Sequence, residues 1–235
     1  RVPLNIAFPL HRFSASLCIP CVFVALAVSV IGVTSSNLIS AMLSTLNLQP
    51  HTDLYMPTGP VAMVLFGIQL CVITPIIEEF VFRGMIFQSM RRFGDSFALV
   101  LSAILFALFH GNLVQAPNAF LMGLGIGYCV LYSGSLWVGV IIHAVNNAMS
   151  LVLDLLCAVL PEEYQSLFLL SVFALYLVAG IAALLVLVRK YPNMFMFIRS
   201  TTFSTERIKY RVAFSSLTMV FALILLVALI IQNMF

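Results

Sequence analysis

Charged residues are scarce in this chain of 235 residues. Asp, Glu, Lys and Arg together make up 8% of the sequence, whereas hydrophobic residues make up 63%. A soluble globular domain has roughly 25% charged residues, so this composition excludes that class and is typical of a polytopic membrane protein. The net charge of +3 is small and confined to a few clusters, which excludes nucleic acid as an expected partner.

Sequence motifs for metal, nucleotide and redox chemistry are also missing. There is no His-Glu-x-x-His helix, and Gly123, Gly125 and Gly127 neither follow a strand nor have nucleotide-loop spacing. These glycines instead predict close helix packing. The five cysteines lie in or beside apolar runs, and the Cys-x-x-Cys at 18–21 lacks βαβ surroundings. We interpret them as core thiols and expect no cofactor and no metal.

Residues 14–35 form an uncharged run long enough to cross a hydrocarbon core of about 30 Å, and further apolar runs follow along the chain. They predict an all-α, polytopic transmembrane helical bundle of about seven spans, forming a single domain over residues 1–235. The expected spans are 14–35, 61–92, 97–110, 118–132, 136–153, 162–189 and 212–233.

Turn-forming and polar residues separate these spans. Residues 36–60 are expected to form an interfacial segment and a loop. Pro75 is expected to kink the second span, and Asp95 or Ser96 to cap the third. The chain begins at Arg1 without a methionine, so we expect residues upstream, and no signal peptide with a cleavage site is visible.

Basic residues predict the orientation in the bilayer, because Lys and Arg gather in cytoplasmic loops. One side of the alternating loops holds Arg1, Arg12, Arg91, Arg92 and the 189–211 group. The other side holds Asp53, Asp154, Glu162 and Glu163. This pattern predicts a multi-pass protein of the cell membrane with a cytoplasmic N-terminus.

Two adjacent carboxylates and a guanidinium lie inside the second span. Residues 60–77 and 84–90 contain no charge, so Glu78, Glu79 and Arg83 lie where an ionised side chain costs several kcal/mol. On a helix Glu79 and Arg83 share a face and can neutralise each other, whereas Glu78 points about 100° away. Glu78 is left without a local partner, which suits it to take a proton from water.

Two further polar clusters interrupt the apolar spans. His110 ends the third span, and His143 and Asn147 lie four residues apart on one face of the fifth. At about 1.5 Å per residue, Glu78 lies about 21 Å from Arg92, and His110 lies about 21 Å from Ser96. Measured from Ser135, Asn147 lies at about 18 Å and His143 at about 12 Å. We expect one intramembrane cavity to collect all four.

These motifs resemble those of a known family, the CAAX-protease and bacteriocin-processing family (CPBP, or Abi). The family comprises intramembrane glutamic endopeptidases and includes the type II CAAX prenyl proteases. The resemblance covers roughly residues 60–155 and rests on three motifs in order: Glu78-Glu79-x-x-x-Arg83, Phe106-x-x-x-His110 and His143-x-x-x-Asn147.

The resemblance implies a metal-independent endopeptidase. In such an enzyme Glu78 with His110 would activate a water, and His143 with Asn147 would form the oxyanion hole. The implied partners are the lipid bilayer and a peptide or protein substrate. Whether that substrate is lipidated or membrane-associated stays open.

The remaining polar residues allow more than one interpretation. Glu79 and Arg83 resemble the supporting ion pair of the motif, but an i, i+4 pair is equally well explained as purely structural. Asn146 points off the face shared by His143 and Asn147, so we interpret it as a bystander.

Three other functions compete with the peptidase. A zinc protease could use Glu78, His110 and His143 as ligands. A transporter could also bury charges, although the chain shows no internal repeat of broken helices. A non-catalytic immunity or scaffolding protein would keep the fold for binding.

Overall fold

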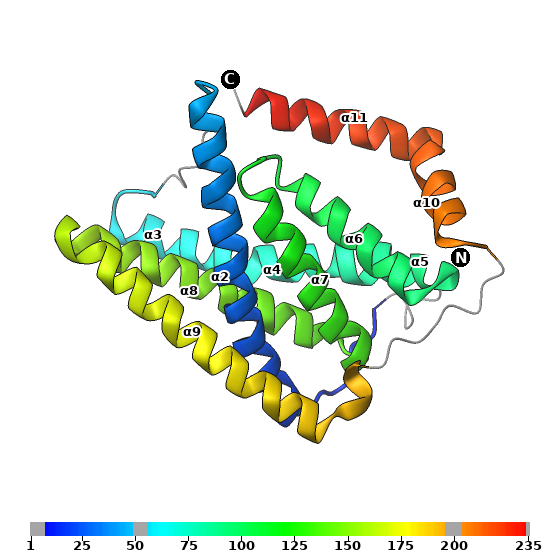
Figure 1. The fold of residues 1–235 in the computed structure, drawn as a ribbon, viewed down its shortest axis with the longest axis horizontal. Helices are drawn as coiled ribbons and strands as arrows, with labels where there is room; N and C mark the ends of the chain where they lie inside the picture. The colour runs from blue at the N-terminus through cyan, green and yellow to red at the C-terminus, as the bar shows by residue number, and fades with distance from the viewer. Residues whose placement is uncertain (1–7, 49–55, 196–203, 234–235) are drawn as a thin grey trace.

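The computed structural model describes residues 8–48, 56–195 and 204–233. These residues form helices and short connections without a β-sheet (Figure 1). The predicted all-α polytopic bundle is therefore confirmed. Arg1, Asp53 and Arg199, which contributed to the predicted orientation, lie outside the described residues.

Four of the described helices are long and apolar enough to cross a membrane. They are α2 (Ala15–Thr45), the composite helix Pro60–Phe93, α8 (Leu136–Val159) and α9 (Glu162–Lys190). A bent pair, α10 (Glu206–Ser215) and α11 (Leu217–Gln232), makes a fifth if both helices form one span. The chain is thus an integral membrane protein, and the predicted number of about seven spans stays a prediction.

The first helix is longer than expected. Residues 36–45 were predicted to leave the span, but α2 continues through them to Thr45. At its end, Ser44 donates to the Ala41 carbonyl at 2.8 Å and Thr45 to the Met42 carbonyl at 2.6 Å. Because these hydroxyls bond within the helix, they do not end it.

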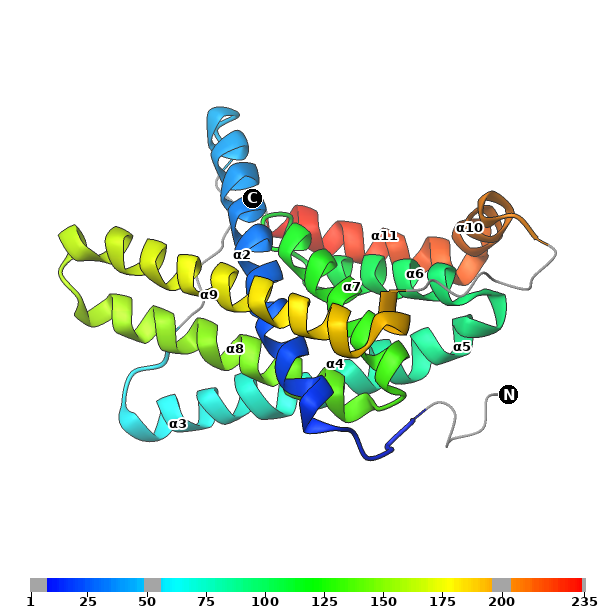
Figure 2. The ribbon, with the colours of Figure 1, turned by 60° about the horizontal axis from the view of Figure 1, so that its bottom comes forward.

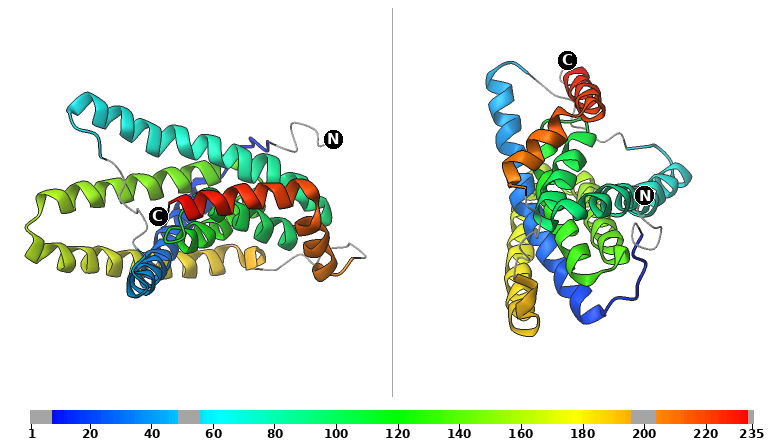
Figure 3. Two further views of the ribbon diagram at one scale, coloured as in Figure 1. Left: turned by 90° about the horizontal axis from the view of Figure 1, so that it is seen from above. Right: turned by 90° about the vertical axis from the view of Figure 1, so that its right-hand side faces the viewer.

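The C-terminal part also differs from the prediction. The expected linker up to residue 211 is helical from Glu206, and the expected span 212–233 is broken at Ser216. Ser216 has φ −68° and ψ 138°, which is outside helical geometry, and the two helices meet at 73°. Figure 3 shows α11 lying along the outside of the bundle, with α10 turned away from it.

The composite helix Pro60–Phe93 matches the predicted second span closely. It contains α3 (Pro60–Ile68), the π-helix η1 (Gln69–Ile73), α4 (Thr74–Glu79), the π-helix η2 (Phe80–Phe87), α5 (Gln88–Met90) and the 3₁₀ turn η3 (Arg91–Phe93). A π-helical turn precedes α4 close to Pro75, and the kink predicted at Pro75 stays a prediction. Such turns within α-helices are rare and are frequent at functional sites.

The next helix, α6 (Asp95–Phe109), begins before its expected cap. Gly94 is the N-cap residue with φ 121°, a conformation that favours glycine, and no side chain caps the helix. Asp95 instead accepts a hydrogen bond from Arg91 Nε at 2.7 Å. This ion pair closes the turn between η3 and α6.

The helices pack as a bundle with one crossing member. Helices α3, α8 and α9 run side by side along the long axis in both Figure 1 and Figure 2. Helix α2 crosses this layer and packs mainly against α9 and α7 (Ala116–Ser133). Helix α7 also packs against α6, so that α4, α6, α7 and α8 surround the middle of the structure.

Two of the three glycines of α7 pack closely against α6, as predicted. A Cβ at Gly123 would lie 3.1 Å from the Ala103 Cα, and one at Gly127 would lie 2.7 Å from a methyl group of Leu99. Gly125 has no atom within 4 Å of such a position, so its predicted packing role is wrong. Small residues here let the two backbones approach.

We expect Gly123→Val to lower the melting temperature in detergent by several degrees, because overpacking a tight contact costs about 1–3 kcal/mol. Gly125→Val is the matched control on the open side of the same helix and should change it little. Equal effects of the two substitutions would show that close packing of α6 and α7 is not the cause.

Candidate functional site

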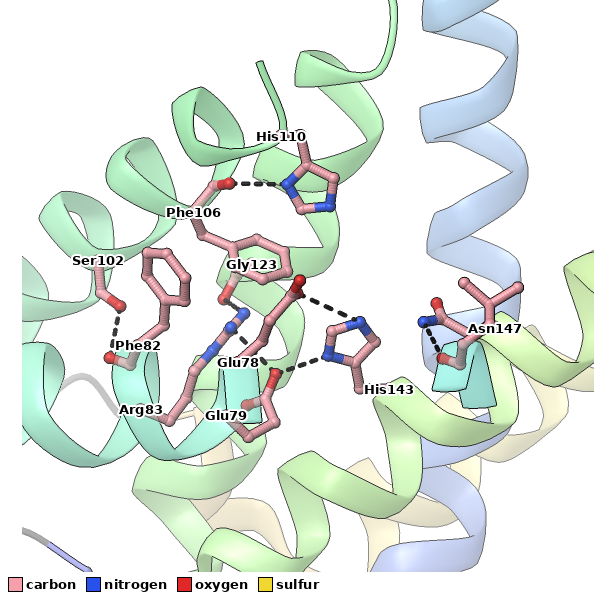
Figure 4. A network of polar contacts seen from close by, with 11 residues as sticks. Glu78, Glu79, Phe82, Arg83, Ser102, Phe106, His110, Gly123, His143 and Asn147 are labelled. Atoms are coloured by element: carbon pink, nitrogen blue, oxygen red, sulfur yellow. Dashed lines mark hydrogen bonds and ion pairs between the residues drawn. The ribbon is translucent and has the colours of Figure 1, made fainter. Parts of the chain in front are cut away.

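Side chains from α4, α6 and α8 meet at a cavity of about 820 Å³. Glu78, His110, His143 and Asn147 all line this cavity, as their predicted depths required. Glu79 and Arg83 do not line it but lie directly behind it, 0% and 1% exposed respectively. The structure therefore brings the six predicted residues into one region (Figure 4).

The buried ion pair forms as the spacing predicted. Arg83 Nη1 lies 3.0 Å from Glu79 Oε1, although off the line of a good hydrogen bond. The guanidinium also stacks on the Phe106 ring, 4.2 Å from its centroid, and donates through Nη2 to the Gly123 carbonyl at 3.2 Å. A guanidinium can make these planar contacts together, which holds α4, α6 and α7 around one charge.

Glu79 has a second partner that the sequence did not reveal. His143 Nδ1 lies 3.0 Å from the same Glu79 oxygen that faces Arg83. A carboxylate paired with Arg83 accepts hydrogen bonds, so Nδ1 carries the hydrogen and the ring orientation is fixed. Glu79 thus links the charge of Arg83 to the position of His143.

The other nitrogen of His143 points toward Glu78. His143 Nε2 lies 3.8 Å from Glu78 Oε2, with the Glu78 side chain 16% exposed. The two side chains are therefore neighbours, although 3.8 Å is too long for a direct hydrogen bond between these atoms.

His110 is oriented by its own helix. Its Nδ1 lies 2.8 Å from the Phe106 carbonyl, and its ring packs edge-on against Phe106 with centroids 4.8 Å apart. A carbonyl only accepts, so Nδ1 carries the hydrogen, and the neutral ring keeps Nε2 as an acceptor. In the view of Figure 4, the Glu78 carboxylate lies between the rings of His110 and His143.

Asn147 binds a backbone carbonyl that Pro75 leaves without a helical donor. The Thr74 N–H is directed to the Gln69 carbonyl in the π-helical turn, and Pro75 has no N–H to offer to Leu70. Asn147 Nδ2 donates to the Leu70 carbonyl at 3.0 Å instead. Its amide keeps one further N–H.

Other residues of the site were not predicted. Asn146 lines the cavity too, and its interpretation as a bystander in the reaction stays a prediction. Gly139 lies one turn before His143, and a Cβ there would lie 2.8 Å from Glu79 Oε2 and 2.7 Å from the Val130 side chain. Only a glycine leaves room for the Glu79 carboxylate, and its spacing of four residues from His143 was the available signal.

The arrangement suits acid–base chemistry on water. The Glu78 carboxylate lines the cavity with its side chain 16% exposed, and His110 Nε2 is a second acceptor on the same cavity. Two acceptors can share the two hydrogens of one water and polarise it. Among the described residues, no group of three or more His, Cys, Asp or Glu side chains is placed to hold a metal ion.

The fold and the site define the class of the protein. It is a membrane-embedded helical bundle with a polar cavity that carboxylate, imidazole and amide groups line. Residues 60–149 match the family model described as type II CAAX prenyl endopeptidase Rce1-like. This segment is similar to the CAAX protease family, and the likeness points to a peptidase with a peptide or protein substrate. Comparison with curated proteins and with solved structures gives no match.

We expect Gly139→Ala to lower peptidase turnover tenfold or more, because its methyl group displaces Glu79 and with it His143; misplacement by about 1 Å can cost a hundredfold. The measurement is kcat/KM in detergent or liposomes, with Gly125→Ala as the glycine control. Gly139→Ala/Val130→Ala relieves the apolar clash alone. If the double variant regained full turnover, the loss in Gly139→Ala would come from the clash with Val130 and not from displacement of Glu79.

Proposed function

We propose that the protein is an intramembrane endopeptidase that hydrolyses a peptide bond with a water held by Glu78 and His110, without a metal ion. The observation that supports this best is that the Glu78 carboxylate and the His110 ring line the same cavity. The bond from His110 Nδ1 to Phe106 leaves Nε2 as an acceptor, and the Glu78 side chain is 16% exposed.

The reaction follows from these acceptors. The water would donate one hydrogen to Glu78 and the other to His110 Nε2, and its oxygen would attack the carbonyl carbon of the peptide bond. Glu78 would take the proton as the carbon–oxygen bond forms. The same proton would pass to the leaving nitrogen when the carbon–nitrogen bond breaks, which returns Glu78 to its ionised form and releases a carboxylic acid and an amine.

Charge develops on the carbonyl oxygen during the attack, and hydrogen-bond donors aimed at it lower the barrier. We assign this task to His143 Nε2 and to the free N–H of Asn147. With Nδ1 donating to Glu79, Nε2 can donate a hydrogen bond only in the doubly protonated ring. Glu79 and Arg83 act as positioning residues because neither lines the cavity.

The surroundings of the site add to the proposal. A cavity among membrane-spanning helices suits a substrate presented from the bilayer, whether or not it carries a lipid group. The basic clusters of the sequence favour a multi-pass protein of the cell membrane with its N-terminus in the cytoplasm.

We expect Glu78→Gln and His110→Ala each to reduce turnover by at least a thousandfold, because each removes an acceptor from the water. Glu162→Gln removes a carboxylate at the start of α9 and is the matched control. The measurement is cleavage of peptides by purified protein in liposomes, with a monodisperse size-exclusion peak for each variant.

The same experiment separates the competing functions. A scaffolding or immunity protein would show no Glu78-dependent cleavage and would keep its cellular output with Glu78→Gln. A zinc protease would contain stoichiometric zinc and would lose activity on chelation and regain it with metal. Either result would contradict the proposed mechanism.

We expect Asn147→Ala to lower kcat about a hundredfold with little change in KM, because an oxyanion donor acts mainly in the transition state. Asn146→Ala is the neighbouring control and should be mild.

The bond from Asn147 to Leu70 offers a purely structural explanation of any loss. In Pro75→Ala the backbone regains an N–H for Leu70, so a structural role predicts that Pro75→Ala/Asn147→Ala restores turnover. The oxyanion role predicts that turnover stays low.

A further inference from the structure

The cavity continues along α8 well past the proposed catalytic residues. Ser150, Leu151 and Asp154 line it in addition to His143 and Asn147. These positions follow at intervals of three or four residues, so one face of α8 forms a wall of the cavity. At about 1.5 Å per residue, Asp154 lies about 16 Å along the helix from His143.

The charges on this cavity have one sign apart from the imidazoles. Glu78 and Asp154 contribute carboxylates, and no Lys or Arg is among its described lining residues. The remaining polar groups are neutral hydroxyls and amides, among them Gln115 and Asn118 on the opposite wall. Such a cavity attracts a cation and disfavours an anion, including a free C-terminal carboxylate near Asp154.

Asp154 is free to take a partner from a substrate. Its side chain is exposed, and it forms no ion pair with any other described residue. Met56, which precedes α3, lines the same cavity. Asp154 therefore lies in the outer part of the cavity, near the end of α8 at Val159.

We propose that Asp154 forms a subsite for a cationic group of the substrate, either a Lys or Arg side chain or a free amino terminus. This inference rests on the proposed peptidase function. An extended peptide advances about 3.3–3.6 Å per residue, and a Lys side chain covers about 6 Å of the distance. The cation therefore lies about three to five residues from the bond that is cleaved.

The test uses peptides that differ at one position. A neutral, membrane-soluble peptide with a mapped cleavage site carries Lys, Gln or Glu in turn at each position up to six residues on either side of the bond. At one position about three to five residues away, we expect Lys to raise kcat/KM about fivefold to tenfold over Gln, and Glu to lower it.

Variants at Asp154 assign the preference. Asp154→Asn should bring the ratio of Lys to Gln peptides close to one at that position, and Asp154→Lys should favour Glu over Lys. Glu162→Gln removes a carboxylate outside the cavity and should keep the wild-type ratio. A ratio that is insensitive to Asp154→Asn and Asp154→Lys would overturn the subsite and leave Asp154 as a charge at the membrane boundary.

Binding to Glu78→Gln protein separates the subsite from the reaction. Fluorescence anisotropy should show tighter binding of the Lys peptide than of the Gln peptide, with Asp154→Asn in the same background removing the difference. Asp154-dependent binding without cleavage by the wild-type protein would uphold the subsite and overturn the proposed function. Glu78-dependent cleavage with equal binding of all peptides would uphold the proposed function and overturn the subsite.

Discussion

The site depends on one buried charge, the guanidinium of Arg83. An ionised group without partners in a low-dielectric interior costs several kcal/mol, so the surrounding residues must supply acceptors and a polarisable face. Glu79, the Gly123 carbonyl and the Phe106 ring provide these from α4, α7 and α6. Glu79 also binds His143 of α8. The contacts that stabilise the Arg83 cation therefore bring four helices together at one point.

Because of this dependence, the two adjacent glutamates have different tasks: Glu79 positions other residues, and Glu78 is available for the reaction. Glu79 lies behind the cavity and contacts Arg83 and His143, whereas the Glu78 carboxylate lines the cavity. Adjacent glutamates on a helix diverge by about 100°, so one can be neutralised while the other stays reactive. The doubled glutamate thus gives one segment two chemically different carboxylates.

The sequence was sufficient to predict which residues share the cavity, but it was not sufficient to predict the contacts between them. Depth along a helix follows from residue count, and for this reason Glu78, His110, His143 and Asn147 could be placed together. The rotation of α8 against α4 depends on packing at Gly139, which residue count does not reveal, so the contact of His143 with Glu79 was missed. The end of α2 was misplaced for a related reason, since its hydroxyls bond within the helix and do not mark a boundary.

The absence of an N–H on Pro75 affects the depth at which α8 can pack in the membrane. A carbonyl without a donor in hydrocarbon costs several kcal/mol, and the Leu70 carbonyl finds its donor only where Asn147 stands beside it. If α8 slid by one turn of about 5.4 Å, it would leave both the carbonyl and the amide unpaired. Apolar helix surfaces alone discriminate poorly between such registers in lipid, so the hydrogen bond from Asn147 to Leu70 contributes to fixing the depth of α8.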